Sequence, residues 1–306
     1  MSAAAATVQV LGGVVLAPLL PGTIQSLKAR LQGRRGPSPL QPYRELRRLW
    51  TKSLADPEPT TPVYRLAPCL VAATTALAIL LVPVGGVSPD WGIGDDALVL
   101  VGLLALGRLA LALASWDTGS GFALMGSSRD LTLAVYAEAL LLLAIVLAAL
   151  PAGSTGLGAM SAAAAGAAIW SEPGHWCAAA AFALVVLFET GRQPIDNPDT
   201  HLELTMIHEG PLLEYAGRDL ALLQWSAAAR HWIVLVLAAG LFLPHGGGFG
   251  AQLGCLLAGI ALLCVALAVT ETAQAKMRIL RVPALLAGGC LLALVGVASW
   301  LVGGVA

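Results

Sequence analysis

Charged residues are scarce in this sequence. Asp, Glu, Lys and Arg together make up only 11% of its 306 residues, whereas 58% are hydrophobic and the mean hydropathy is +0.80. A water-soluble domain usually carries about 25% charged residues. Because so few charges could not cover the surface of a soluble protein of this length, a soluble enzyme is excluded. The composition predicts an integral membrane protein in contact with the lipid bilayer.

Motifs for cofactors and nucleic acids are also missing. The cysteines are single residues within apolar segments, at Cys69, Cys177, Cys255, Cys264 and Cys290. Because no pair has the CxxC spacing of iron–sulfur or zinc ligands, we expect no metal site and no cofactor in this chain. There is no GxGxxG or Walker loop, and His208-Glu209 is not followed by the second His of a zinc-protease helix. The basic residues are not interleaved with base-stacking aromatics, which argues against nucleic acid as a partner.

Long apolar segments fill most of the chain. A helix needs about 20 apolar residues to cross the hydrocarbon core of a bilayer. Eight segments meet this requirement: about 3–24, 66–86, 97–115, 131–150, 174–190, 221–243, 250–271 and 283–303. The sequence therefore predicts an all-α, polytopic protein with about eight transmembrane helices in a single membrane domain, 1–306. The Gly- and Ser-containing stretch 152–172 is less hydrophobic, which favours a surface or re-entrant segment.

The first long connection, residues 25–65, contains an expected amphipathic helix. Its sequence at 43–54 is YRELRRLWTKSL, in which Leu and Trp recur at helical spacing with Arg and Lys between them. This pattern is typical of a helix that lies in the membrane interface. Anchoring to anionic lipid and lining a site are both compatible with it.

Lys and Arg are distributed unevenly between the connections. Cytoplasmic loops of membrane proteins are enriched in these residues. With eight spans, the connections after the first, third, fifth and seventh spans lie on one side, and they hold fifteen of the seventeen Lys and Arg residues. The other two, Arg108 and Arg230, fall inside spans. We therefore expect a cell-membrane protein whose basic connections are cytoplasmic and whose termini are both non-cytoplasmic.

The most charged connection is the segment 189–219, here called the acidic loop. It reads ETGRQPIDNPDTHLELTMIHEGPLLEYAGRD and contains seven acidic residues, two His and two Arg. Such an island beside apolar spans is costly unless it lies in water or lines a polar cavity. Asn197-Pro198 is a favourable helix start, so a helix is predicted from Pro198 to Glu209. Because its polar and apolar residues are mixed around the axis, we interpret this helix as packed into protein with carboxylates facing a polar cavity.

Ionisable residues also fall within or at the end of predicted spans, among them Arg108, Glu138, Arg230 and Glu271. Each costs about 2.5–3.5 kcal/mol at the centre of a membrane helix, so such residues usually have a function. One interpretation is that Arg108 or Arg230 pairs with Glu138 and only holds helices together. The other is that these groups continue a chain of protonatable sites from the acidic loop into the membrane.

Three stretches of the sequence resemble a known family. The acidic loop, with DNPDTHLELTMIHE, resembles the loop between the fifth and sixth helices of the membrane subunit that docks the hydrophilic arm of respiratory complex I (its subunit 1) and of energy-converting [NiFe] hydrogenases. ARLQGRRGPSPLQPYRELRRLW at 29–50 resembles the first cytoplasmic loop of that subunit, and DTGSGFALMGSSRDLTLAVYAE at 117–138 resembles the entry to its fourth helix. The sequence of the acidic loop is more similar to the hydrogenase branch of this family, that of hydrogenase-4 component C and the formate hydrogenlyase membrane subunits.

The resemblance implies a role and a set of partners. It implies a non-redox subunit that anchors a peripheral hydrogenase-like large subunit and a small iron–sulfur subunit beside antiporter-like membrane subunits. The [NiFe] and [4Fe–4S] centres would lie in those partners. Electron transfer there would be coupled to proton movement in the membrane.

The resemblance also assigns site residues, none of them catalytic. A docking loop of Arg34, Arg35, Gly36 and Pro37 would face a cavity. The wall of that cavity would be formed by Glu189, Arg192, Asp196, Glu203, Glu209 and Glu214. Glu138 would lead from it into the membrane.

Three alternatives stay open at this point. In complex I the corresponding cavity takes quinone, so a quinone-site subunit of an NADH:quinone oxidoreductase-like complex is the first. The second is a stand-alone ion transporter, which would show internal repeats with paired broken helices, and no such repeat is found. The third is a passive scaffold.

Overall fold

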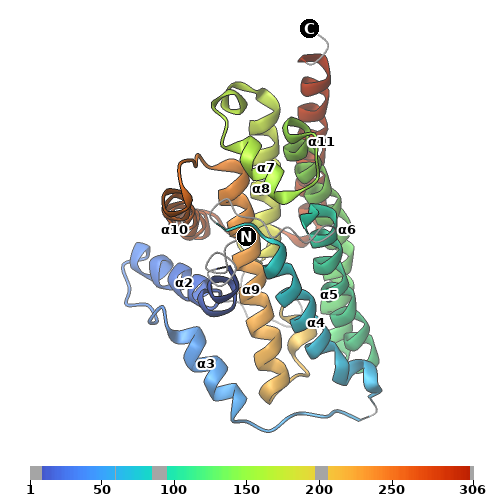
Figure 1. Ribbon diagram of the computed structural model, residues 1–306. Helices are drawn as coiled ribbons and strands as arrows, with labels where there is room; N and C mark the ends of the chain where they lie inside the picture. The colour runs from blue at the N-terminus through green and yellow to red at the C-terminus, as the bar shows by residue number, and fades with distance from the viewer. Residues whose placement is uncertain (1–8, 59, 85–94, 197–205, 304–306) are drawn as a thin grey trace.

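The computed structural model describes residues 9–58, 60–84, 95–196 and 206–303, which are helical apart from the connecting loops (Figure 1). In chain order its helices are η1 (Gly12–Leu16), α2 (Leu19–Leu31), α3 (Gln41–Trp50), α4 (Pro62–Leu81), α5 (Ala97–Asp117), α6 (Gly121–Ala149), η3 (Leu150–Ala152), α7 (Leu157–Ala164), η4 (Ala167–Ser171), α8 (Pro173–Glu189), η5 (Gly210–Leu212), α9 (Gly217–Phe242), α10 (Phe249–Ala273), η6 (Ile279–Arg281) and α11 (Val282–Gly303).

The long helices occupy the predicted spans. Within the described residues, six helices are long and apolar enough to cross a membrane: α4, α5, α6, α9, α10 and the helix that ends the chain, α11. The first predicted span corresponds to two helices, Gln9–Leu16 and Leu19–Leu31, bent by 49° relative to each other. The fifth corresponds to α8, which has only 17 residues. The protein is an all-α polytopic membrane protein, with six spans by length in its described part, or seven if the bent pair counts as one.

The bend in the first span has a local cause. Pro18 directly precedes α2, and a proline has no amide hydrogen to continue the hydrogen-bond ladder of the preceding helix. After the bend, α2 continues to Leu31, seven residues beyond the predicted end of the span at 24. As a result Lys28, which the sequence places in a loop, lies on a helix and is buried.

Helix α9 lies at the centre of the molecule (Figure 1). It packs against α4, α8, α3 and α10. Every residue from Trp232 to Ala239 is buried, which is typical of a helix that is apolar on all sides. By contrast, α10 and α11 leave many large apolar side chains exposed, among them Leu262 and Leu291, as expected for surfaces in contact with lipid or with other membrane subunits.

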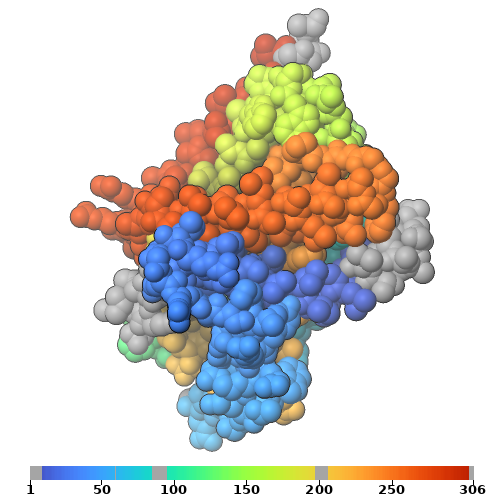
Figure 2. All heavy atoms as spheres, turned by 90° about the vertical axis from the view of Figure 1, so that its left-hand side faces the viewer, coloured from blue at the N-terminus to red at the C-terminus, as the bar shows by residue number. Residues whose placement is uncertain are grey.

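The amphipathic helix is confirmed as α3, although it ends at Trp50 rather than at Leu54. Leu49 is buried on the side that packs against α9, whereas Arg44 is exposed. In Figure 2 α3 lies on the surface below α2 and α10, and α10 runs across this face.

The helix predicted in the acidic loop does not extend to Glu209. Residues 197–205 lie outside the described residues, and Glu203 with them. Residues 206–209, the end of the predicted helix, form no helix, and the short helix η5 follows. Gly210, the first residue of η5, packs closely against α6, where a Cβ on it would lie 2.8 Å from the Cα of Gly126.

Candidate functional site: a buried network of charged residues

The end of α8 brings the first half of the acidic loop back into the protein. Gly191 follows the helix with φ +59°, a left-handed conformation that favours glycine. The amide of Gly191 donates to the carbonyl of Phe188, and the amide of Arg192 donates to that of Leu187. This turn directs Glu189 and Arg192 towards different neighbours, and each becomes part of a buried ionic cluster.

The larger cluster, here called the Arg108 cluster, contains Arg108, Asp130, Glu138, Glu189 and Arg230. The guanidinium of Arg108 on α5 lies 2.6 Å from Oε1 of Glu189 and 2.7 Å from Oε1 of Glu138. Its Nε lies 3.7 Å from Oδ2 of Asp130 on α6, and Nη1 of Arg230 on α9 lies 3.3 Å from Oε2 of Glu189. Glu138, with a third of its side chain exposed, is the outermost member.

The Arg108 cluster has one more carboxylate than guanidinium groups. Four helices contribute to it, and the side chains of Arg108 and Glu189 are almost fully enclosed. Holding ionised groups in such a place is costly unless each is paired, because removal from water costs several kcal/mol per ion. An enclosed cluster with a surplus carboxylate can take up a proton without placing a new net charge in the membrane.

The second cluster, here called the Glu271 cluster, joins α2, α10 and the acidic loop. Nη1 of Arg192 donates to Oε1 of Glu271 at 2.9 Å, and Nζ of Lys28 lies 3.3 Å from Oε2 of the same carboxylate. The side chain of Glu271 is fully buried. This arrangement gives Lys28 and Arg192, which the sequence assigns to loops, positions inside the protein.

Three further residues of the network are Asp196, Lys276 and His208. Nζ of Lys276 donates to Oδ1 of Asp196 at 2.7 Å. Nδ1 of His208 lies 3.6 Å from Oδ2 of Asp196, and Nε2 lies 3.9 Å from Oδ1 of Asp130. His208 therefore stands between the Asp196–Lys276 pair and the Arg108 cluster.

The environment of the loop shifts two pKa values in opposite directions. Burial alone raises the pKa of Asp196, but His208 and Lys276 outweigh it and lower the pKa to about 2. Burial lowers the pKa of His208, but Asp196 and Asp130 outweigh it, so the pKa lies above the usual value. The imidazole is thus more easily protonated here than in water, while Asp196 stays ionised.

Some of the residues assigned from the sequence meet in this network. They are Arg108, Glu138, Glu189, Arg192, Asp196 and Arg230. Glu209 is half-buried beside His208 in the chain, directly before η5. Glu214 contributes its backbone carbonyl, which accepts a hydrogen bond from the hydroxyl of Tyr64 at 2.7 Å.

The expected docking loop lies apart from the network. Arg34, Arg35, Gly36 and Pro37 are exposed, and Nε of Arg34 donates to the side chain of Gln32. A Cβ on Gly36 would overlap the Cβ of Ala29, so this loop folds back on α2. Within the described residues, no ion pair joins these four positions to the acidic loop.

Four members of the network are not singled out by the sequence: Lys28, Asp130, His208 and Lys276. Glu271 is singled out as an ionisable residue at the end of a predicted span, although not as a site residue. A signal existed for Asp130, which lies within the family-like stretch 117–138. Lys28 and Lys276 carried no signal, because neither the bend of the first helix nor the path of the α10–α11 connection is visible in the sequence.

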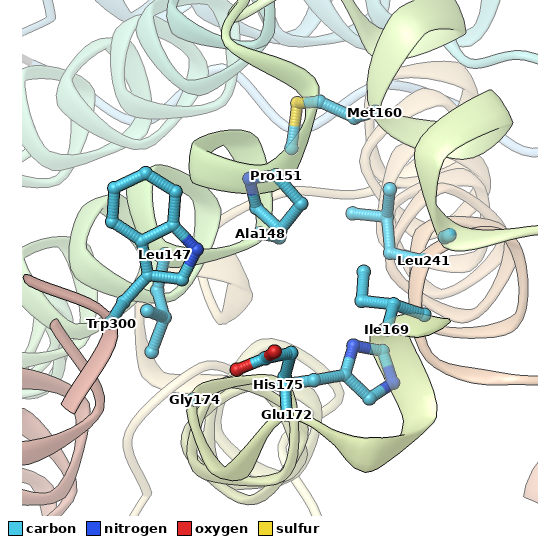
Figure 3. Close-up of a pocket in the computed structure, with 11 residues that line it drawn as sticks. Leu147, Ala148, Pro151, Met160, Ile169, Glu172, Gly174, His175, Leu241 and Trp300 are labelled. Atoms are coloured by element: carbon cyan, nitrogen blue, oxygen red, sulfur yellow. The ribbon is translucent and has the colours of Figure 1, made fainter. Parts of the chain in front are cut away.

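A small cavity, partly open to the surface, lies among α6, α7, α8, α9 and α11 (Figure 3). Its volume is about 10 Å³, about the room of one water molecule. Glu172, His175 and Trp300 line it together with apolar side chains, as Figure 3 shows. The residues that line it are separate from those of the two ionic clusters.

Comparison with known proteins assigns the family. The model of the NADH dehydrogenase family matches residues 4–301. The chain belongs to the NADH dehydrogenase family. Hydrogenase-4 component C of Escherichia coli (strain K12) is 34% identical over 299 residues, which cover 95% of this chain and 93% of that protein. Formate hydrogenlyase subunit 4 of the same organism is 33% identical over 276 residues, 86% of this chain and 83% of that protein.

A solved structure shows the same fold for this member of the NADH dehydrogenase family. It is that of the membrane-bound sulfane sulfur reductase (MBS), an archaeal respiratory membrane complex. One of its chains superposes with a TM-score of 0.83 at 21% identity, covering 97% of this chain and 98% of that one. The resemblance to the family of complex I subunit 1 and to its hydrogenase-type branch, expected from the three sequence stretches, is confirmed by the family model and the two Escherichia coli relatives.

Proposed function

We propose that this chain is the membrane-anchoring and energy-coupling subunit of a [NiFe]-hydrogenase-like oxidoreductase of the energy-converting hydrogenase or formate hydrogenlyase type. In this role it links electron transfer in a docked peripheral arm to proton movement. The observation that carries the proposal is the network itself. In the described part of the chain, ten charged side chains and one histidine, drawn from α2, α5, α6, α8, α9, α10 and two loops, form ion pairs inside a protein that is otherwise poor in charge.

The network supports proton movement better than a purely structural role. Replacing buried ion pairs with packed apolar residues is often neutral or stabilising, so stability alone does not account for so many of them. The Arg108 cluster also extends from Glu138, whose side chain is partly exposed, to Glu189, whose side chain is enclosed. A proton path needs such a connection between the surface and the interior. Glu203 and Glu209 are further candidates for its carboxylates.

The partners follow from the relatives. Similarity over nearly the whole chain to a component of hydrogenase-4 and to a subunit of formate hydrogenlyase supports a subunit of a complex over a single-chain transporter. We infer a peripheral large subunit with the [NiFe] centre, a small subunit with [4Fe–4S] clusters and antiporter-like membrane subunits. The acidic loop and the exposed docking loop face the cytoplasm in this proposal, and the termini face the other side.

Affinity purification of the tagged full-length chain from mild detergent tests the assembly. Mass spectrometry of the co-purified proteins should find a large subunit with paired CxxC motifs for nickel and a small iron–sulfur subunit, in amounts equal to this chain. Recovery of the chain alone, or with a flavin- and NADH-binding module instead, contradicts the hydrogenase assignment. A control purification with an unrelated tagged membrane protein sets the background.

A groove between α2 and α10 supports a second candidate, a quinone site. Its volume is about 380 Å³, within the range of small-molecule sites of about 300–1,000 Å³. Apolar side chains of both helices line it, and polar groups come from Thr23, Ser26 and Arg30. Figure 2 shows the face on which these two helices meet. Photolabelling with a quinone analogue tests this candidate: labelled peptides from α2 and α10 support it, and no protection by excess quinone contradicts it.

A further inference from the structure

We propose that His208 is the residue that passes protons between Asp196 and the Arg108 cluster. This inference rests on the proposed function, because it names the link within the same network. It adds a residue that neither the sequence stretches nor the relatives assign to the path.

The first support is the unmet hydrogen-bonding capacity on both sides of the ring. Among the described residues, neither ring nitrogen of His208 has a hydrogen-bond partner, although both are enclosed, and Oδ1 of Asp130 is also enclosed without one. The separations of 3.6 Å to Asp196 and 3.9 Å to Asp130 are longer than the 2.7–3.2 Å typical of a hydrogen bond. An enclosed polar group left unsatisfied is unfavourable, so a small movement of the ring towards either carboxylate is favourable.

The second support is the way that the ring is held between the two carboxylates. Phe188 contacts the imidazole edge-on, with ring centroids 5.2 Å apart. Two residues further on, Gly210 packs against Gly126, one helical turn before Asp130 on α6. These contacts fix the backbone of His208 near both acids while leaving each ring nitrogen able to form a bond.

The third support is the distribution of charge around the ring. The carboxylates that face it are Asp196 from the acidic loop and Asp130 from α6, with Glu189 of α8 at longer range. The cation that acts on the ring is Arg108 of α5, and Lys276 forms an ion pair with Asp196. His231 of α9 also lies close enough to interact. Because the Arg108 cluster has one carboxylate more than guanidinium groups, a proton that reaches Asp130 neutralises that surplus.

The transfer balances as follows. Nδ1 of neutral His208 accepts a proton that arrives at Asp196, and an N–H bond forms. The N–H bond at Nε2 then breaks, and its proton forms an O–H bond on Asp130. The ring is left neutral with its proton on Nδ1, and the starting tautomer returns when Nδ1 loses that proton to water and Nε2 gains one from water. The raised pKa of His208 favours the protonated intermediate.

The test uses the intact complex reconstituted into vesicles, and it measures protons translocated per hydrogen formed. His208→Gln keeps a polar side chain but cannot carry a proton, so we expect this ratio to fall at least about tenfold. The ratio should fall similarly in His208→Ala, and added imidazole should restore part of it. His245→Gln is the matched control, because His245 interacts with Ser161 and the carbonyl of Leu243, away from the network.

The outcomes separate the relay from the proposed function. A wild-type ratio in His208→Gln overturns the relay; if Glu138→Gln loses translocation in the same preparations, the coupling role still stands. An assembled His208→Ala complex that imidazole does not restore shows a structural role for His208 and also overturns the relay. Normal ratios in the His208, Glu138 and Glu189 variants together contradict the coupling role itself.

Discussion

Gly210 packs its backbone against that of Gly126 on α6. A Cβ on Gly126 would lie 2.7 Å from the Cα of Gly210. Asp130 follows Gly126 by four residues and therefore lies on the same side of α6. The contact between Gly210 and Gly126 thus sets the distance between the acidic loop and the carboxylate of Asp130, which His208 faces.

Gly126→Ala should disturb this junction. The added methyl group meets backbone rather than a flexible side chain, so we expect a loss of about 1–3 kcal/mol in stability and a lower ratio of translocated protons to hydrogen formed. Gly102→Ala is the control, because a Cβ there meets nothing within 4 Å and alanine favours the helix α5. Thermal denaturation of the purified complex measures the first effect. Equal midpoints for the two variants would contradict the close contact.

Glu271→Gln should destabilise the protein strongly. The substitution leaves Lys28 and Arg192 enclosed with a neutral partner, and breaking a buried pair in this way costs about 3–5 kcal/mol. Arg65→Gln serves as the comparison, since Arg65 and Asp56 form an exposed pair that is worth about 1 kcal/mol or less. The readout is the amount of folded chain recovered after detergent extraction at increasing temperature. If the Glu271 variant proves as stable as the Arg65 variant, the Glu271 cluster does not hold α2 to α10.

The stability contributed by His208 should depend on pH in a defined direction. Its pKa is raised in the folded protein, so its contribution is fully present below the unfolded value of about 6.5 and is lost as pH rises through the folded value. The difference in melting temperature between wild type and His208→Gln should therefore be largest near the unfolded value and below it, and shrink as the pH is raised. A difference that stays constant over this range would contradict the assigned shift.

Asp196 should behave in the opposite way. Its pKa is lowered to about 2, so its contribution is present above its unfolded value of about 4 and disappears as pH falls towards 2. Asp196→Asn should consequently differ from wild type in melting temperature at neutral pH and approach it in acid. A difference that grows towards low pH would show that Asp196 is not held by His208 and Lys276.

The helices were predictable from the sequence, whereas their connections were not. Apolar runs long enough to cross a bilayer specify α4, α5, α9, α10 and α11 within a few residues. The helix α2 continues to Leu31 and packs against α10, a contact between segments far apart in the chain that the sequence does not show. Residues 206–209 likewise form no helix although their sequence favours one, and Gly210 directly after them packs against Gly126.

The ionic network was predictable only in part, for a related reason. Charge inside a predicted span pointed directly to Arg108, Glu138 and Arg230, because such residues need partners wherever they lie. Lys28 and Lys276 look like ordinary loop cations until the fold brings them to Glu271 and Asp196. Resemblance to a family transfers positions along the chain but not the direction of side chains, so the sequence did not show that Glu214 would meet Tyr64 through its backbone carbonyl.

The most direct test of the coupling role is the number of protons translocated per hydrogen formed by the intact complex in vesicles when Glu138 is replaced by Gln. Glu138 is a suitable choice because its partial exposure makes loss of folding less of a concern than at the enclosed Glu189. Glu172→Gln, at an exposed residue outside the network, is the matched control. The coupling role predicts that Glu138→Gln assembles and loses at least about nine-tenths of translocation, the effect of removing one proton-transfer group, while Glu172→Gln retains it. Full translocation by an assembled Glu138→Gln complex, repeated with Glu189→Gln, would contradict it.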